Sequence, residues 1–272
     1  MNDFTSKLYS EPFALLPSAF GDLLQRSREL TPEARSDDQV GFTDYRGRTI
    51  YPQVEMIGPV AKVPVQGVIG RHESPLMTYW YGLADSYLLQ EQLRNVREDS
   101  DVEIVVLDIR SRGGLAIGLE EVTDDIRRIS EAGKPVIAWV DHIAASAAYR
   151  IAAACDAIYA EPCAVVGSIS TIMSGVDSSK RWENEGLELK LFAGGDLKAL
   201  GMPGKKWTEA EEKHVQERLD LYDSKFKDYI RARRAVTDDH MRGQTWEAKE
   251  VSGVLVDGYA NSLAELIAGL LS

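Results

Sequence analysis

Cysteine, histidine and long apolar runs are all scarce in this chain of 272 residues. Its two cysteines, Cys155 and Cys163, lie among small apolar residues, which predicts buried reduced thiols rather than a disulfide framework. The four histidines are scattered and no zinc-type spacing of cysteine and histidine occurs, so we expect neither a metal site nor a cofactor. This pattern favours a reducing compartment, which we take to be the cytoplasm.

The chain also lacks the sequence features of membrane insertion and is short of positive charge. No run of about 18 apolar residues occurs, and the first residues lack the basic start and apolar core of a signal peptide. We therefore expect a soluble protein without a membrane span. The formal net charge of −12 makes nucleic acid an unfavourable partner, because phosphate backbones are themselves negative.

The pattern of the chain divides it into two parts. Residues 1–59 are predicted to form an N-terminal arm with one short helix and a polar connector, and residues 60–272 a single domain. In the domain, apolar runs typical of buried strands alternate with helical patterns, which predicts β–α–β units and a mainly parallel sheet. The expected strands are 63–69, 102–109, 136–140, 157–160, 164–169 and 187–192, with a short strand and turn at 253–258. The expected helices are 79–98, 118–132, 145–155, 178–185, 208–234 and one from about 262.

Two glycines, Gly113 and Gly114, come soon after the apolar run 102–109. A glycine backbone can approach a ligand closely and point its N–H groups outward, as an oxyanion hole requires. A tight turn between a strand and a helix is the plainer explanation of the same pair. The glycines are therefore a candidate site only in combination with other residues.

Ser146 is the candidate nucleophile. It follows a predicted strand and begins a helix of small residues, where the helix dipole favours negative charge. Its alanine neighbours are expected to leave the hydroxyl accessible. The alternative is an N-cap serine on a tightly packed helix.

A serine nucleophile needs a base. His142 is only four residues before Ser146, and His214 lies inside the long predicted helix, so a Ser–His–Asp triad is weakly supported. Lys198 lies in a glycine-flanked loop after an apolar run, and burial of an amine favours its neutral, basic form. The one Ser-x-x-Lys sequence lies inside the long helix and lacks the companion motifs of penicillin-binding enzymes. We therefore prefer Lys198 as the base.

Four short motifs occur in order along the chain. They are the pair Gly113-Gly114, then Ala144-Ala-Ser146-Ala-Ala-Tyr149, then Val166-Gly-Ser168-Ile169, then Ala193-Gly-Gly-Asp-Leu-Lys198. In this order they resemble the signal peptide peptidase A family of Ser–Lys peptidases, and most closely its phage branch, the head-maturation or capsid assembly proteases. The resemblance covers about residues 60–260. It implies a Clp protease/crotonase-like parallel β/α superhelix, here with an N-terminal arm and C-terminal helices.

The resemblance also implies roles for single residues. Ser146 matches the family nucleophile and Lys198 the general base. Ser168 matches the serine that orients the lysine, and the backbone of Gly113 and Gly114 matches the oxyanion hole. Family membership further implies polypeptide substrates, scaffold or capsid proteins in the phage branch, and a homo-oligomeric ring in which serine and lysine can come from neighbouring subunits. A phage-encoded member is expected in the host cytoplasm or the procapsid.

The sequence departs from the family pattern in two places. The usual Asp-Ser-Pro-Gly-Gly loop is Arg110-Ser-Arg-Gly-Gly here, so Arg112 replaces a proline and adds a charge near the predicted oxyanion hole. The chain also ends soon after the protease core, without the scaffold segment fused to some phage members. Two other functions stay open: a crotonase-like enzyme acting on acyl-coenzyme A, which needs no Ser–Lys pair, and a catalytically inactive ring that binds scaffold.

Overall fold

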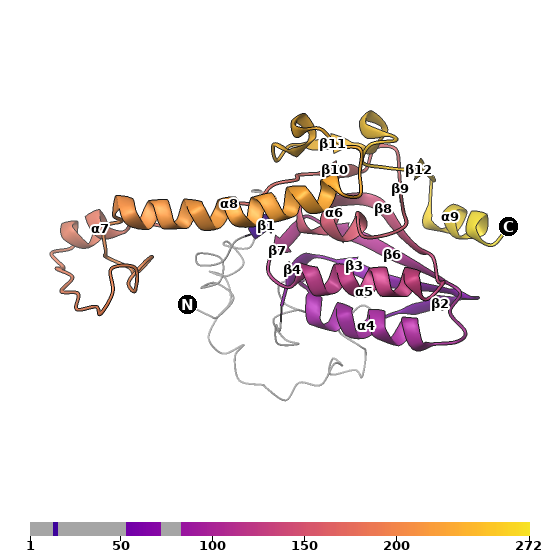
Figure 1. Ribbon diagram of the computed structural model, residues 1–272, viewed down its shortest axis with the longest axis horizontal. Coiled ribbons are helices and arrows are strands. Elements are labelled where there is room, and N and C mark those ends of the chain that lie inside the picture. Colours follow the sequence, from indigo (N-terminus) through magenta and orange to yellow (C-terminus); the bar gives the residue numbers. More distant parts are fainter. Residues whose placement is uncertain (1–12, 16–52, 72–82) are drawn as a thin grey trace.

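The computed structural model describes residues 13–15, 53–71 and 83–272, which form two β-sheets with helices packed around them (Figure 1). The main sheet has the strand order β11-β10-β8-β6-β3-β2, and β9 pairs with both β8 and β12. Its four central strands run parallel, which confirms the predicted α/β class with a mainly parallel sheet. These strands are β3 (Val60–Gln66), β6 (Ile104–Ser111), β8 (Val136–Ala145) and β10 (Val165–Gly167).

Shorter elements complete the main sheet. β2 (Glu55–Ile57) and β11 (Thr245–Glu247) run antiparallel to the strands beside them, whereas β9 (Ala157–Ala160) and β12 (Gly258–Tyr259) run parallel. Two short 3-10 helices, η2 (Asp238–Met241) and η3 (Ala248–Val251), flank β11. Within the predicted arm 1–59, β2 thus pairs with the domain. The short helix expected in that arm falls outside the described residues, and the boundary at residue 59 stays a prediction.

The second sheet has the order β1-β7-β4-β5, and two of its strands continue directly from strands of the first sheet. β4 (Val68–Gly70) follows β3 after Gly67, whose φ of 95° requires glycine, and β7 (Gly113–Leu115) follows β6. The outer strands are β1 (Phe13–Leu15) and β5 (Leu83–Asp85). This sheet therefore begins where the parallel strands of the main sheet end, the edge at which α/β proteins commonly bind their ligands.

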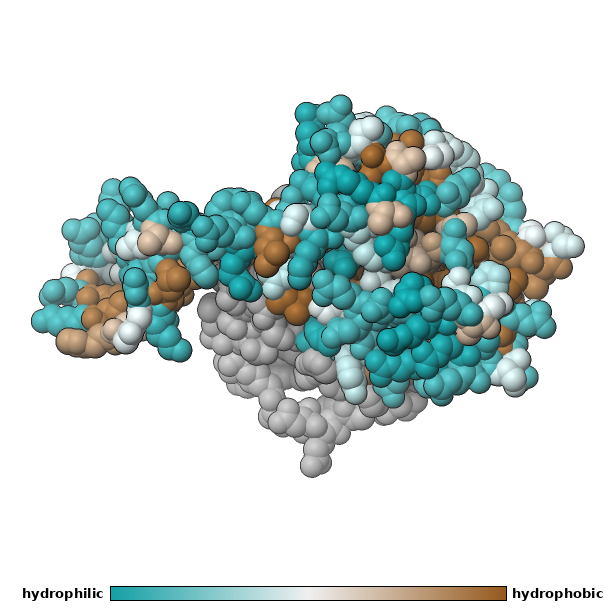
Figure 2. All heavy atoms as spheres, viewed as in Figure 1, coloured by the Kyte–Doolittle hydropathy of each residue, from teal (hydrophilic) through white to brown (hydrophobic). Residues whose placement is uncertain are grey.

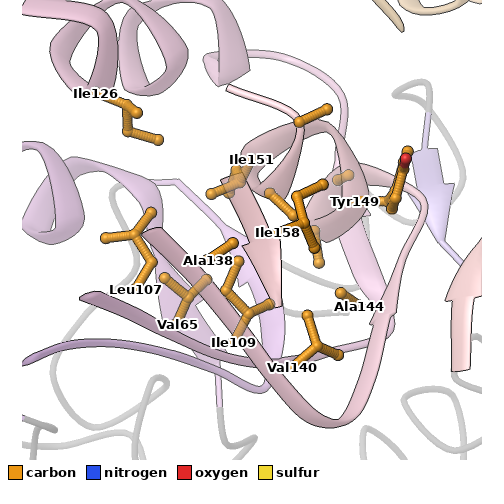
Figure 3. Close-up of a cluster of buried hydrophobic side chains, with 14 of the residues drawn as sticks. Val65, Leu107, Ile109, Ile126, Ala138, Val140, Ala144, Tyr149, Ile151 and Ile158 are labelled. Atoms are coloured by element: carbon orange, nitrogen blue, oxygen red, sulfur yellow. The ribbon is translucent and has the colours of Figure 1, made fainter. Parts of the chain in front are cut away.

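Helices cover both faces of the main sheet, so its strands are apolar on both sides. Helices α4 (Ser86–Glu98) and α5 (Leu119–Glu131) lie side by side over one face (Figure 1), where Leu107 and Ile109 of β6 join their core (Figure 3). Val106, which alternates with them, packs in a second cluster with α9 (Leu263–Leu270). This double burial explains the continuous apolar run from which the strand was predicted.

Helix α8 (Glu209–Arg231) projects from the body (Figure 1). Its 23 residues span about 34 Å, and its buried apolar side chains, Phe226 and Ile230, belong to its C-terminal half. Beyond its N-terminal end lie α7 (Ser179–Asn184) and an irregular segment; we call residues 175–207 the distal lobe. Neither α8 nor any other helix among the described residues has the length and apolar character needed to cross a membrane.

The expectations for residues 187–192 and for Cys163 are wrong. Residues 187–192 form no strand, because a strand needs a hydrogen-bonded neighbour and the described part of the distal lobe contains none. Cys163 is exposed, because it lies in the turn between β9 and β10, where its N–H donates to the Glu161 side chain at 2.8 Å. Cys155 is largely buried as expected, and burial raises the pKa of its thiol.

Candidate active site

Ser146 occupies a strained turn between β8 and α6 (Ala147–Ala152). Its φ of 60° and ψ of −120° belong to no region that an L-residue adopts freely. Among the described residues, Ser146 and Ser168 are the two non-glycine residues with a positive φ. Backbone strain of this kind gathers at functional sites, and here it marks two of the serines singled out from the sequence. The expectation of an accessible hydroxyl is wrong for the isolated chain, since Ser146 is only 1% exposed among closely packed alanines.

Ser146 and Ser168 are neighbours because β8 and β10 run parallel. Ala145 pairs with Gly167, so the next residue of each strand is a serine. The Ser146 N–H donates to the Gly167 carbonyl at 2.7 Å, and the Ser168 N–H donates to the Gln244 carbonyl at 2.7 Å. These backbone bonds hold both turns in place against their strain.

The glycine pair lies beside the same turn. Ser111 at the end of β6 pairs with Ala144 of β8, and β7 packs against α6. The Gly113 N–H donates to the Ser111 hydroxyl at 3.2 Å. A Cβ on Gly114 would lie 2.1 Å from the Ile69 carbonyl oxygen, so only glycine allows β4 to approach this closely. The structure thus brings Ser146, Ser168 and the two glycines together. The role of the glycines in an oxyanion hole stays a prediction.

A polar network next to Ser146 was missed from the sequence. The Ser146 hydroxyl donates to the Ser170 carbonyl at 3.5 Å, and the Ser170 hydroxyl donates to Asp223 of α8 at 2.7 Å. Asp223 also accepts from the Thr171 N–H at 2.9 Å and pairs with Lys227 at 2.5 Å. Burial would raise the pKa of Asp223, but these hydrogen bonds outweigh burial and lower it. The spacing of Asp223 and Lys227 on one helix face was visible in the sequence, whereas their contact with the Ser170 segment was not.

Lys198 lies in the distal lobe, away from the other predicted site residues. It is exposed, and its N–H donates within its own loop to the Gly195 carbonyl at 3.1 Å. Asp223 marks where α8 passes Ser170, and the N-terminal end of α8 is about 20 Å further along the helix axis. Figure 1 shows the lobe beyond that end, with α6 on the body. One chain therefore does not bring Lys198 to Ser146.

Charged groups surround the loop in which the sequence departs from the family pattern. Arg110 donates from Nε to Asp141 at 3.2 Å and forms an ion pair with it, which ties this side chain to β8. Asp108 is buried nearby and accepts from Gln66 at 3.3 Å. Burial, followed by the charge of Asp141, raises the pKa of Asp108. Arg112 is exposed at the junction of β6 and β7, so the extra charge lies at the surface beside the glycines.

Comparison with known proteins identifies relatives of this chain by sequence. A serine protease SPPA of Arabidopsis thaliana chloroplasts is 29% identical over 220 residues, covering 78% of this chain and 31% of its own length. Capsid assembly protease C of Escherichia phage lambda is 25% identical over 219 residues, covering 80% of this chain and 48% of its own. The head-tail preconnector protein GP5 of Enterobacteria phage P21 is 26% identical over 208 residues, covering 76% and 41%. The chain thus spans less than half the length of these relatives.

Solved structures show likenesses of fold. An enoyl-CoA hydratase of Mycobacterium smegmatis has a TM-score of 0.49 at 16% identity, covering 81% of this chain and 76% of its own. A membrane-bound stomatin-specific protease in complex with a substrate peptide has a TM-score of 0.39 at 14% identity, covering 77% and 78%.

The family model of peptidase family S49 matches residues 128–262, a range that contains Ser146, Ser168 and Lys198. The sequence relatives, among them the serine protease SPPA, the capsid assembly protease and the head-tail preconnector protein, confirm the relationship predicted from the four motifs. This chain is therefore similar to peptidase family S49 over residues 128–262.

Proposed function

We propose that this chain is a serine endopeptidase that works through a Ser–Lys dyad, with Ser146 as the nucleophile and Lys198 as the general base. The observation that carries the proposal is the buried turn at Ser146, whose strained backbone holds one side chain in a fixed direction at a cost in folding free energy. Similarity to a peptidase family over residues 128–262 supports this interpretation of the strain.

The proposed reaction is peptide hydrolysis through an acyl-enzyme. The neutral amine of Lys198 takes the proton of the Ser146 hydroxyl, and the oxygen attacks the scissile carbonyl. The backbone N–H of Gly114 stabilises the oxyanion, joined by that of Gly113 once it leaves the Ser111 hydroxyl. The lysine returns the proton to the leaving amine, and water, activated by the same lysine, then releases the acyl group. Ser168, beside Ser146, orients the lysine by accepting a hydrogen bond from its amine.

Because one chain holds Lys198 far from Ser146, we propose that a neighbouring copy supplies the lysine. The distal lobe exposes large apolar side chains, and Figure 2 shows them gathered on it. Phe192 is 94% exposed, Val176 59% and Leu187 52%, a pattern typical of a surface that another protein covers. Docking of the lobe on a second copy would also bury the amine of its loop, and burial favours the neutral form of an amine.

The projecting half of α8 supports the same assembly. Its apolar stripe continues through Val215, Leu219 and Tyr222, which stay only half-buried because the described body packs under the other half. An amphipathic helix is stabilised mainly by packing of its apolar face. A second copy of this chain would supply that packing, and a ring of copies would give each Ser146 a lysine.

The proposed substrates are polypeptides, and specifically scaffold or capsid proteins of a phage. The support is the name of one relative, the capsid assembly protease of phage lambda. The corresponding location is the host cytoplasm or the procapsid.

Complementation between two inactive variants tests the dyad and its origin together. Ser146→Ala and Lys198→Ala chains, carrying different tags, are co-expressed and purified through both tags. Each variant alone should not cleave an unstructured polypeptide. Mixed rings should regain about a quarter of the wild-type turnover, because a random half of the serines and a random half of the lysines are intact.

Lys190→Ala is the matched control, since it removes another exposed lysine of the same lobe and should keep full activity. A serine-directed covalent probe should label the wild type and not Ser146→Ala. Turnover that survives Ser146→Ala, or Lys198→Ala by itself, would contradict the dyad. Mixed rings that stay inactive would contradict the shared site.

A further inference from the structure

The N-terminal strand β1 lies on the edge of the glycine strand β7. The two strands pair antiparallel, with Ala14 opposite Gly114, and Leu15 opposite Gly113. Three consecutive residues of β1 therefore pair with the three residues of β7, including both predicted oxyanion glycines.

This edge of β7 is where an extended substrate would bind. The other edge is occupied by β4, which pairs with β7 at Ile69 and Gly114. An incoming peptide can add a strand only to a free edge, where its backbone completes the hydrogen bonds of the sheet. Because β7 packs against α6, which begins after Ser146, a peptide on this edge would join the strand that neighbours the helix of the nucleophile.

We propose that Phe13–Leu15 is a built-in pseudosubstrate, which occupies the peptide-binding edge of β7 until a substrate displaces it. The proposal rests on the proposed peptidase function and adds its regulation. The burial of Ser146, at 1% exposure, agrees with it, since a nucleophile in that state needs an opening step before a polypeptide reaches it.

The strand is built to be displaced. It has three residues and is the outermost strand of its sheet, so little backbone pairing holds it. As part of the same chain it acts at a high effective concentration, of the order of millimolar, and inhibits without tight binding. We expect the full chain to show a KM about tenfold above that of a chain without β1, with kcat unchanged, as for a competitive inhibitor.

The experiment compares the full-length oligomer with a variant that lacks residues 1–16, on a short peptide substrate. Two full-length variants, Ala14→Pro and Leu15→Pro, separate strand pairing from chain length. Neighbouring residues of a strand point their N–H groups to opposite edges, so one of the two prolines must remove a donor that faces β7. That variant should reproduce the lower KM, and Ala19→Pro, beyond the end of β1, should not.

A synthetic peptide of residues 8–20 gives a readout that needs no turnover. It should bind the truncated chain in the Ser146→Ala background about tenfold more tightly than the full chain, by fluorescence anisotropy, and should compete with substrate in the active truncated enzyme. Truncation that leaves KM unchanged, or that raises KM while lowering Tm, would overturn the proposal and make β1 a structural strand. If the chain is not a peptidase, all variants should lack turnover and probe labelling. Tighter binding of the peptide to the truncated chain would then still support occupancy of this edge by β1. Equal binding to both chains would overturn that occupancy.

Discussion

Replacing Ser146 by glycine should leave the protein more stable than replacing it by alanine, although both changes remove the hydroxyl. Alanine keeps the Cβ that makes φ 60° and ψ −120° unfavourable, and glycine does not. The hydroxyl itself adds little to this comparison, because both variants lose its 3.5 Å hydrogen bond to Ser170.

The size of the difference follows from three opposing contributions. An L-residue in a sparsely populated backbone region costs about 1–3 kcal/mol, and the upper value applies here because ψ is far from the left-handed helical value. Glycine gives back about 0.5–1 kcal/mol through the greater freedom of its unfolded chain. Loss of one buried methyl group costs about 0.8 kcal/mol more. The net result is a free energy of unfolding about 1 kcal/mol higher for glycine, or about 3 °C in Tm.

Urea denaturation at one fixed protein concentration measures this difference, since assembly makes apparent stability depend on concentration. Ser170 is the matched control. Its φ is not positive, so its glycine variant should be less stable than its alanine variant by about 0.4–1 kcal/mol. If glycine at position 146 is the less stable of the two, as at 170, the strain attributed to this turn is not stored in its backbone.

Two further predictions concern the neighbourhood of the site. Gly114→Ala places a Cβ 2.1 Å from the Ile69 carbonyl oxygen, so urea denaturation should show a loss of about 3 kcal/mol in the free energy of unfolding, and the oligomer should lose peptidase activity. Gly195→Ala is the control: it has open space around it and should change the free energy of unfolding by less than about 0.5 kcal/mol. A Gly114→Ala variant as stable as the wild type would refute the close approach of β4. Because burial raises the pKa of Asp108 in the folded state, its ionisation costs stability as pH rises, so Asp108→Asn should be more stable than the wild type at pH 7 and should lose this advantage below the unfolded pKa of about 3.9. Free energies of unfolding measured across this pH range check the sign, and an advantage that grows towards acid pH would contradict it.

The parts of the fold that the sequence predicted are those decided locally. The run 102–109 reads as a strand buried on both faces, and it is one, because α4, α5 and α9 cover both faces of β6. The helix at 208–234 was predicted nearly to its ends, since its capping box and apolar stripe are local signals. The run 187–192 shows the limit: its apolar residues suit a strand, but a strand forms only beside another, and the distal lobe offers none among the described residues.

The same division holds for the candidate site. Ser146 was singled out because the sequence pattern predicts a strand followed by a helix of small residues. The resemblance to the family motifs added Ser168 and Lys198 as candidate site residues. That Ser146 and Ser168 lie side by side depends on the parallel pairing of β8 with β10, which joins residues more than 20 positions apart. No local pattern carries such pairing, because hydrogen bonds between strands do not depend on side-chain identity.

By itself, the sequence determined the α/β class, the strand–turn–helix at Ser146 and the similarity to a peptidase family. Only the tertiary structure decided that both marked serines are strained, that β1 pairs with the glycine strand, and that the lobe carrying Lys198 points away from the body. The reason is the range of the interactions: caps, turns and apolar periods act within a few residues, whereas the direction of α8 and the partner of β7 are set by packing between distant segments.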